Sequence, residues 1–294
     1  MENHPTTVDI VIAGFSIRLF SNAEIELEEG YLPFVVENKT LKTDISVECI
    51  AGIPTTLFEQ THPVFEAEND EKKFYSIYRV ASNLGFVIYN QENGSIQQIA
   101  LLNNDFTHWK IYSEKTSSGS ILPFRYPMGP IVMHYMTFTS GAVMMHASCA
   151  FDGKKARLFS GFSGAGKSTI SKLWSDAGSM IVNDDRLIIR KQGDEYFVHN
   201  TPMYYKDIPK KVRLNSIFLI SHSPENKIQK LTGALAISNV MAFSIQNNFD
   251  KQFVQSRLEL FHDICSHVSV YKLGFVPNQS VVNFIRSHEA GEND

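Results

Sequence analysis

A glycine-rich segment between an apolar run and an amphipathic run constrains the fold of this chain more than any other feature. The apolar run is residues 156–160, and the segment from Gly161 to Thr169 reads Gly-Phe-Ser-Gly-Ala-Gly-Lys-Ser-Thr. The amphipathic run extends from there to Ala177 and is followed by Gly178. Glycines at this spacing, after a strand and before a helix, are typical of a loop whose backbone wraps an anion. The sequence therefore predicts a strand, a phosphate-binding loop and a helix in direct succession.

The predicted loop contains the residue types that bind a nucleoside triphosphate. Gly161, Gly166, Lys167 and Ser168 stand in the G-x-x-x-x-G-K-[ST] spacing. Glycine lets backbone N–H groups approach phosphates, the lysine reaches the β- and γ-phosphates, and the serine hydroxyl is a ligand for Mg²⁺. A merely flexible glycine loop would not require the flanking strand and helix. We expect ATP or another nucleoside triphosphate, with Mg²⁺, to bind through Gly161, Ser163, Gly164, Ala165, Gly166, Lys167, Ser168 and Thr169.

Two adjacent carboxylates follow the next apolar run. The residues Met180-Ile-Val-Asn lead directly into Asp184 and Asp185. A magnesium ion beside phosphates usually needs a carboxylate ligand, and an attacking hydroxyl must lose its proton. We therefore expect Ser168, Asp184 and Asp185 to form a metal site. The alternative is that the two aspartates form an exposed turn that leads into the following strand.

The polar segment 114–119 separates two parts of different texture, and we place the domain boundary there. Residues 1–118 are predicted to form a β-rich, mostly antiparallel domain, with Asn93-Gly94 as a hairpin turn. Residues 119–294 are predicted to form a P-loop nucleotide-binding domain. The strands predicted for the first part are Val8–Phe20, Tyr31–Val36, Phe74–Val80, Phe86–Tyr89 and Ile96–Leu102.

Helical and strand patterns alternate in the second part, so the fold class is α+β with an α/β-like C-terminal half. The predicted helices are Ile131–Thr139, Ser168–Ala177, Leu231–Ser244, Lys251–His267 and Gln279–Ser287. The predicted strands are Val143–Ala150, Ala156–Ser160, Met180–Val182, Leu187–Arg190, Tyr196–His199, Ile217–Ser221 and Val268–Phe275.

Composition and charge argue against several classes of partner. Lys and Arg number 27 against 31 Asp and Glu, a net charge of −4 that offers no broad attraction for nucleic acid or anionic lipid. The three cysteines form no CxxC pair, and no secretory signal is evident, so we expect a cytoplasmic protein. The uncharged stretch between Arg125 and Asp152 is long enough to span a membrane. Its prolines and histidines favour a buried helix followed by a buried strand instead.

The motifs together resemble one known family. The run from His146 to Thr169, followed by Ile181-Val-Asn-Asp-Asp-Arg, resembles the catalytic domain of bacterial HPr kinase/phosphorylase, which has the phosphoenolpyruvate carboxykinase-like P-loop fold. The resemblance covers about residues 125–200. It implies a phosphotransferase with His146 near the transferred phosphate, and with Asp184 and Asp185 dividing the roles of general base and metal ligand beside Lys167. It also favours a homo-oligomer.

One family motif is missing, and this leaves the substrate open. The Glu-Ile-Arg-Gly signature is absent, and the corresponding region reads His199-Asn-Thr-Pro-Met-Tyr-Tyr-Lys-Asp207. Neither HPr as substrate nor phosphorylase activity is therefore implied. The acceptor is a hydroxyl of an unknown protein, peptide or small molecule, and ATP, ADP and pyrophosphate remain open as donors. Thr201, Tyr204 and Lys206 either approach the substrate or belong to a structural loop.

Other classes of protein share parts of this pattern. An ABC-type ATPase would share the loop, but no Leu-Ser-Gly-Gly-Gln signature follows. Small metabolite kinases usually begin with the P-loop strand and have an arginine-rich lid. His262, Cys265 and His267 suggest a metal site, yet the apolar residues around them are typical of an ordinary packed helix. A non-catalytic nucleotide-binding regulatory or assembly protein remains the alternative.

Overall fold

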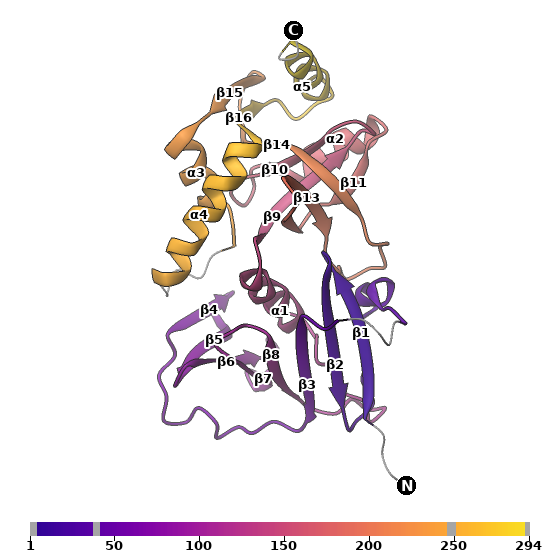
Figure 1. Ribbon diagram of the computed structural model, residues 1–294, viewed down its shortest axis with the longest axis vertical. Coiled ribbons are helices and arrows are strands. Elements are labelled where there is room, and N and C mark those ends of the chain that lie inside the picture. The colour runs from indigo at the N-terminus through magenta and orange to yellow at the C-terminus, as the bar shows by residue number, and fades with distance from the viewer. Residues whose placement is uncertain (1–4, 38–41, 246–250, 292–294) are drawn as a thin grey trace. The chain divides into compact units, whose positions relative to one another are not determined.

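The computed structural model describes residues 5–37, 42–245 and 251–291 (Figure 1). The chain divides into two compact units, Met1–Ser140 with Pro202–Pro209, and Gly141–Thr201 with Lys210–Asp294. Each unit contains its own sheet together with helices, so the predicted α+β class is confirmed. The compact units divide later in the chain than the predicted boundary, and the assignment of two domains at 118/119 stays a prediction.

The first unit is built on one sheet with the strand order β1-β2-β3-β8-β7-β6-β5-β4. Neighbouring strands are antiparallel except for β2–β3 and β3–β8, which are parallel. The strands are β1 (Thr6–Ile12), β2 (Phe15–Ser21), β3 (Ile45–Ala51), β4 (Phe65–Asn69), β5 (Lys72–Val80), β6 (Asn83–Tyr89), β7 (Ile96–Leu102) and β8 (His108–Ser113). The helical segments are η1 (Glu29–Phe34), α1 (Met128–Met136) and η2 (Thr137–Thr139).

The predicted strand Tyr31–Val36 is wrong, because η1 is a 3₁₀ helix. Tyr31 and Phe34 are both buried, and a spacing of three residues puts them on the same face of a 3₁₀ helix. Pro33 lies between them and lacks the N–H group that a strand would use in its ladder. The apolar residues of this run therefore form the buried face of a helix and do not indicate a strand.

The second unit has its strands connected in the order β10-β9-β12-β13-β14-β16-β15, with β10 also pairing with β14, and β11 pairing with β9. The strands are β9 (Ala142–Phe151), β10 (Ala156–Ser160), β11 (Met180–Asn183), β12 (Arg186–Gln192), β13 (Glu195–Asn200), β14 (Lys211–His222), β15 (Lys227–Leu231) and β16 (Ser269–Phe275). The helices are α2 (Lys167–Asp176), α3 (Gly233–Ala242), α4 (Lys251–His267) and α5 (Ser280–Gly291).

Two long strands change partners along their length and thereby join two layers of this sheet. The first half of β9 pairs with β12, whereas its second half pairs with β10 and β11. The start of β14 pairs with β13, whereas the remainder lies parallel to β10 and β16. The strand that leads into the phosphate loop, β10, therefore lies between the two long strands.

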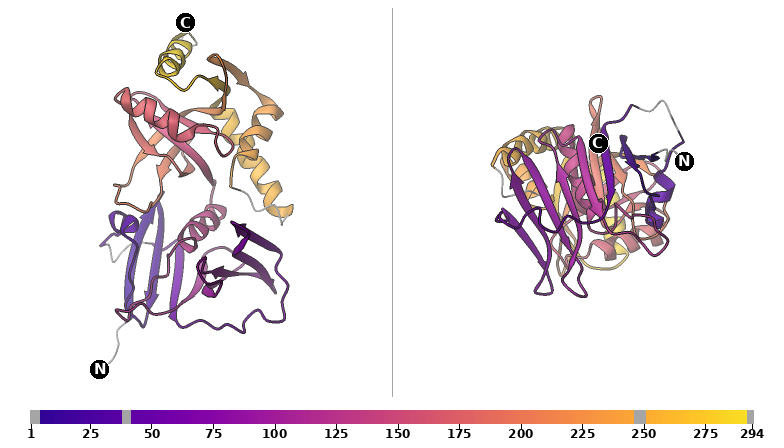
Figure 2. Two further views of the ribbon diagram at one scale, coloured as in Figure 1. Left: turned by 180° about the vertical axis from the view of Figure 1, so that it is seen from behind. Right: turned by 90° about the horizontal axis from the view of Figure 1, so that it is seen from below.

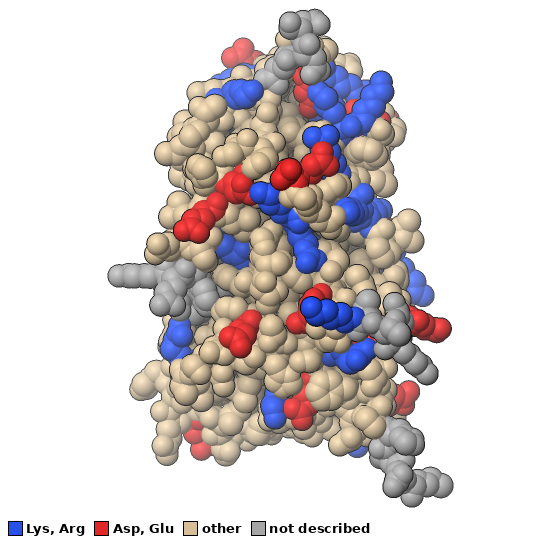
Figure 3. All heavy atoms as spheres, in the orientation of Figure 1, with Lys and Arg blue, Asp and Glu red and all other residues tan. Residues whose placement is uncertain are grey.

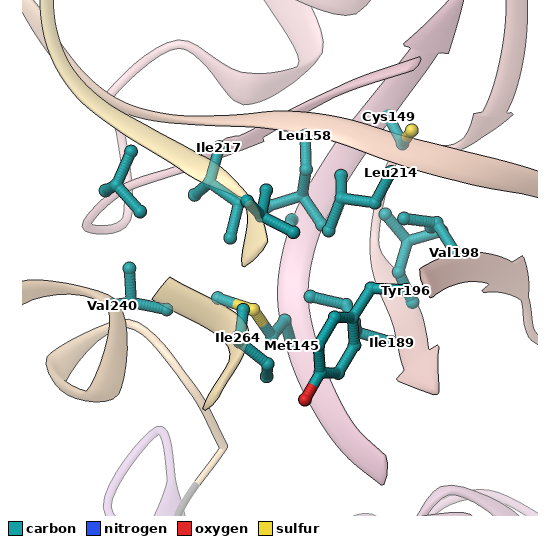
Figure 4. Close-up of a cluster of buried hydrophobic side chains, with 14 of the residues drawn as sticks. Met145, Cys149, Leu158, Ile189, Tyr196, Val198, Leu214, Ile217, Val240 and Ile264 are labelled. Atoms are coloured by element: carbon teal, nitrogen blue, oxygen red, sulfur yellow. The ribbon is translucent and has the colours of Figure 1, made fainter. Parts of the chain in front are cut away.

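The second unit has two hydrophobic layers, one on each face of the parallel strands β10, β14 and β16. Alternate residues point to opposite faces of a strand. Leu158, Ile217 and Val270 accordingly pack with α3, α4 and the β12–β13 hairpin (Figure 4). Phe159, Phe218 and Tyr271 instead pack with α2 and α5, and Figure 2 shows α2 lying across these strands. Burial on both faces fixes β10, the strand that leads into the loop.

The uncharged stretch that follows Arg125 forms a helix and then a strand, as predicted. α1 spans nine residues, and seven of them are buried. The following strand, β9, is buried at nearly every position. Within the described part of the chain, no helix has both the length and the apolar character to cross a membrane.

Candidate functional site

The phosphate loop begins where β10 ends, and its glycines stand where a Cβ atom would clash or where the backbone has a positive φ. A Cβ atom at Gly161 would lie 2.8 Å from the carbonyl oxygen of Ile220 on β14. Gly164 and Gly166 have φ angles of 78° and 96°, in the left-handed region that favours glycine. The loop closes through a hydrogen bond from the Ala165 N–H to the carbonyl of Phe162 at 3.1 Å.

The helix that leaves this loop begins with its N–H groups available to an anion. Gly166 is the N-cap of α2, and no side chain caps this end. The first N–H groups of a helix have no partner within the helix, and its dipole favours negative charge at this end. Ser163, Ser168 and Thr169 are exposed here. The loop and the helix end therefore offer backbone donors and hydroxyl groups at one place.

The Lys167 side chain folds back over the loop. Its Nζ donates to the carbonyl oxygens of Gly161 at 3.0 Å and Phe162 at 3.2 Å. The residue is buried, and this burial lowers the pKa of the amine, while the Asp185 carboxylate acts in the opposite direction. A polyphosphate would offer this ammonium stronger acceptors than the two neutral carbonyls.

An aromatic pair from two neighbouring strands contacts the phosphate loop. The His222 ring, at the end of β14, lies 3.0 Å from the Gly164 carbonyl through Nε2 and stacks on Phe275 of β16 with a centroid distance of 5.8 Å. A Cβ atom at Gly166 would lie 2.8 Å from the Phe275 ring. Because β10, β14 and β16 are parallel, their carboxyl ends meet on the same side of the sheet.

The two aspartates lie in a turn between β11 and β12 that Asn183 organises. The buried Asn183 side chain accepts hydrogen bonds from the N–H groups of Asp184 at 2.7 Å and Asp185 at 3.3 Å. Its amide group donates to the carbonyls of Arg186 at 3.0 Å and Thr201 at 3.3 Å. The side chain of Asn183 therefore fixes the backbone of the turn that carries both carboxylates.

Asp185 pairs with an imidazole and a guanidinium. Its Oδ1 lies 3.1 Å from Nδ1 of His146 on β9, and its Oδ2 lies 2.6 Å from Nη1 of Arg186. The pairing follows from register, because Arg186 is opposite His146 in the β9–β12 ladder. Burial by itself would raise the pKa of Asp185, but the hydrogen bond from His146 and the positive charges of Arg186, His146 and Lys167 outweigh it and lower the pKa.

His146 is the exposed exception on a buried strand. Residues 142–145 and 147–150 of β9 are buried, whereas half of the His146 side chain surface is accessible. Its carbonyl accepts a hydrogen bond from Ser160 Oγ at 3.1 Å, which ties the strand to the residue before the loop. A histidine that were only part of the core would not be exposed here.

The structure brings most of the predicted catalytic residues together. His146 contacts Asp185, and the charge of the Lys167 amine contributes to the lowered pKa of that carboxyl. The Asp184 carboxylate has no hydrogen bond or ion pair to another described residue. Among residues 5–37, 42–245 and 251–291, no three His, Cys, Asp or Glu side chains come together as a metal site. Ser168, Asp184 and Asp185 as metal ligands stay a prediction.

Near the end of α4, Cys265 packs against the hydrophobic core and His267 has a structural contact. His267 Nδ1 bonds to the Asp263 carbonyl at 2.8 Å, and Asp263 also accepts hydrogen bonds from Tyr196 and Lys191.

The segment with Tyr204 and Lys206 belongs to the first unit, where Lys206 pairs with Glu29 at 3.3 Å. Thr201 belongs to the second unit and donates to the Arg186 carbonyl at 2.9 Å.

Sequence reasoning missed three residues that shape this site. Arg186 and Asn183 flank the aspartates directly, and a cation and an amide beside two carboxylates were an available signal. His222 had no local signal, because it reaches the loop only through the parallel pairing of β14 with β10. Its position just after a predicted strand was not informative without that pairing.

Two open cavities of about 430 and 560 Å³ are lined only by residues of the first unit, so neither includes the phosphate loop. A loop that binds phosphates through its backbone does not need a deep apolar cavity. On the face drawn in Figure 3, basic and acidic side chains are interspersed. This distribution agrees with the small net charge of the chain.

Comparison with known proteins identifies a relative for the central segment. A family model described as phosphoenolpyruvate carboxykinase matches residues 131–211, from α1 to the start of β14. The matched segment includes the phosphate loop and the aspartate turn. The predicted resemblance to a phosphoenolpyruvate carboxykinase-like P-loop domain is confirmed for this segment. No curated protein matches the chain.

A solved structure, the HPr(Ser) kinase/phosphatase from Coxiella burnetii, is similar at 12% sequence identity. The similarity covers 51% of this chain and 99% of that chain, with a TM-score of 0.32. A similarity at this level does not establish a common fold. The family match therefore stands on its own.

Proposed function

We propose that this chain binds ATP with Mg²⁺ and transfers the γ-phosphoryl group to a hydroxyl of a protein, peptide or small-molecule acceptor, as a kinase of the HPr serine kinase type. The observation that carries the proposal is the Asp185–His146 pair on β9 and the aspartate turn, within electrostatic range of the Lys167 amine of the phosphate loop. A phosphate cradle alone would serve binding. A cradle next to a carboxylate and an imidazole suits phosphoryl transfer.

In this proposal, the loop and α2 bind the polyphosphate. The backbone N–H groups around Gly164 and Gly166 surround the phosphates, and Lys167 exchanges its two carbonyl acceptors for β- and γ-phosphate oxygens. The exposed hydroxyl of Ser168 and a carboxylate oxygen of the aspartate turn are hard ligands that fit Mg²⁺. When bound, Mg²⁺ neutralises charge on the β- and γ-phosphate oxygens.

The acceptor reacts at the aspartate turn. Its oxygen forms a bond to the γ-phosphorus, the bond from phosphorus to the bridging oxygen breaks, and ADP leaves with the electron pair. We assign the hydroxyl proton to Asp184, because this carboxylate is not committed to another described residue. Asp185 stays ionised and holds Nδ1 of His146, which leaves the other ring nitrogen, Nε2, to face the transferred group.

ADP formation from MgATP tests this proposal in the presence of hydroxyl acceptors. We expect Asp184→Asn to lower turnover by at least about 100-fold, since general base catalysis contributes that much or more. Asp194→Asn, at the exposed β12–β13 turn, is the matched control and should retain native turnover. If the native chain binds MgATP tightly but turns over on no acceptor, the non-catalytic regulatory or assembly role is favoured instead.

A further inference from the structure

An exposed phenylalanine lies in the phosphate loop itself. Phe162 follows the first glycine of the loop, and 74% of its surface is accessible, a higher fraction than any other large hydrophobic residue described in the second unit. Scattered exposed hydrophobic residues are common and need no explanation. This one is different because the loop around it is fixed by β10 before it and by Lys167, which bonds to its carbonyl.

Phe162 forms an aromatic pair with Phe243, the residue after α3. The two rings meet edge to face, with centroids 4.7 Å apart. Phe243 is partly buried and packs against the core that α3 and α4 cover. We call the two rings the Phe162–Phe243 platform. One ring is anchored in the core, and the other is presented to solvent.

The chain after α3 holds this platform against β9, the strand that carries His146. Ser244 forms a bridge with Met145 of β9, and the Ile245 N–H donates to the Met144 carbonyl at 3.2 Å. β10 pairs with β9 only as far as Ala147. The segment after α3 thus runs along β9 where β10 has turned into the loop, one residue away from His146.

The platform belongs to the γ-phosphate end of the site and not to the nucleoside end. The Phe162 carbonyl lies 3.2 Å from Lys167 Nζ, and this amine is the group that reaches the β- and γ-phosphates. A base attached beyond the α-phosphate therefore lies further from Phe162 than the γ-phosphate that this amine contacts.

We propose that the Phe162–Phe243 platform binds an apolar or aromatic group that flanks the acceptor hydroxyl. This inference rests on the proposed function and names the substrate class: a hydroxyl compound with an apolar neighbour, whether a serine between apolar residues or a free aromatic alcohol. His146, Asp185 and Arg186 supply the polar side of the reacting centre. The platform supplies the apolar side, and contact with two aromatic rings stabilises an apolar group more than a charged one.

Phosphorylation of two acceptor sets with MgATP tests the inference. The first set is serine hexapeptides that differ only in having phenylalanine, leucine, aspartate or lysine on both sides of the serine. The second set is benzyl alcohol and ethanol. We expect kcat/KM for the phenylalanine peptide to exceed that for the aspartate peptide by about tenfold, as one aromatic contact of this kind allows. If only the peptides or only the free alcohols show this preference, the result identifies whether the acceptor hydroxyl belongs to a peptide or to a small molecule.

Variants of the exposed ring provide the decisive comparison. In Phe162→Ala the ratio of kcat/KM between apolar and charged acceptors should fall to about one, while Phe162→Leu should retain part of it. A ratio between two acceptors cancels any change in nucleotide binding. Leu235→Ala removes another exposed apolar side chain, on α3, and should keep the native ratio.

Three outcomes overturn the inference. Transfer by the native chain without preference for apolar acceptors, or a preference that Phe162→Ala leaves intact, contradicts the platform alone and leaves the phosphotransferase proposal standing. A native chain that binds MgATP and phosphorylates no member of either set contradicts the platform as the acceptor site. If its ADP formation is also insensitive to Asp184→Asn, the proposed function fails as well.

Discussion

At the level of single residues, the phosphate loop contains two glycines with the same backbone requirement and different surroundings. Gly164 and Gly166 both have φ in the left-handed region. A Cβ atom at Gly164 would meet nothing within 4 Å, whereas one at Gly166 would lie 2.8 Å from the Phe275 ring. That ring is fully buried and stacked on His222, so it has little room to move.

Alanine at these two positions should separate backbone strain from steric conflict. We expect Gly164→Ala to cost about 1 kcal/mol, the usual penalty for a left-handed alanine. Gly166→Ala should cost about 3 kcal/mol because overpacking against Phe275 adds to the same strain. Urea unfolding followed by Trp174 fluorescence, in a Trp109→Phe background, measures both. Equal costs would contradict the described position of the Phe275 ring.

The Asp185 pairing predicts a pH dependence of stability. Because the folded state lowers the pKa of this carboxyl, its contribution is fully present above the unfolded value of about 3.9 and is lost as the pH falls through the folded pKa. Asp185→Asn should therefore be less stable than the native chain at pH 7, and the difference should shrink in strong acid. The exposed Asp194→Asn control should show no such change. A difference that grows in acid would reverse the predicted sign.

Residue-level inference is most direct where chemistry is local in sequence. Lys167 and the glycines followed from one motif, whereas the contact of His146 with Asp185 is a finding of the structure. His222 was not predictable, since its contact with the Gly164 carbonyl joins residues 58 positions apart. Pairings at that distance depend on strand order, which local patterns do not contain.

At the level of elements, a buried ion network attaches the last helix to the strand that carries the loop. Arg157 of β10 donates from Nε to Oε1 of Glu289 at 2.9 Å and from Nη2 to Oε2 at 2.6 Å. Its Nη1 donates to Asp152 at 2.8 Å, and its guanidinium lies 4.4 Å above the Trp174 ring of α2. Three elements, β10, α2 and α5, therefore meet at one buried arginine.

Removal of one partner from this network should destabilise the second unit. Glu289→Ala leaves the buried guanidinium with only Asp152 as a charged partner, and we expect a loss of about 3 kcal/mol, at the lower end for a broken buried pair. Glu259→Ala, at an exposed position of α4, should change stability by less than about 0.5 kcal/mol. The Trp174 signal in urea reports both. Equal effects would mean that Glu289 does not anchor α5.

Elements with strong periodicity were predicted to their ends, and short half-exposed strands were missed. β7, β10 and α4 begin and end as predicted. Strands β4 and β15 have mostly exposed or polar residues, so no apolar alternation marked them. β3 alternates inward and outward along its length, so its pattern was sufficient to predict a strand there.

At the level of the whole molecule, composition and pattern indicated the α+β class but not the pairing of strands. The division of β9 and β14 between two sets of partners brings the phosphate loop, the aspartate turn and His222 to one side of the second unit. The sequences of β9 and β14 do not indicate the point at which each strand changes its pairing partners. The sequence also did not indicate that residues 202–209 belong to the first unit.

Calorimetric titration of the native chain with MgATP tests the central claim most directly, since every proposal here requires polyphosphate to bind at Lys167. We predict saturable binding at one site, weakened about 100-fold in Lys167→Ala, because a charge-assisted contact with phosphate contributes about 3 kcal/mol. Lys172→Ala, on the same helix but exposed and paired with Asp176, should bind like the native chain. No binding by the native chain, or equal affinity in Lys167→Ala, would contradict the account.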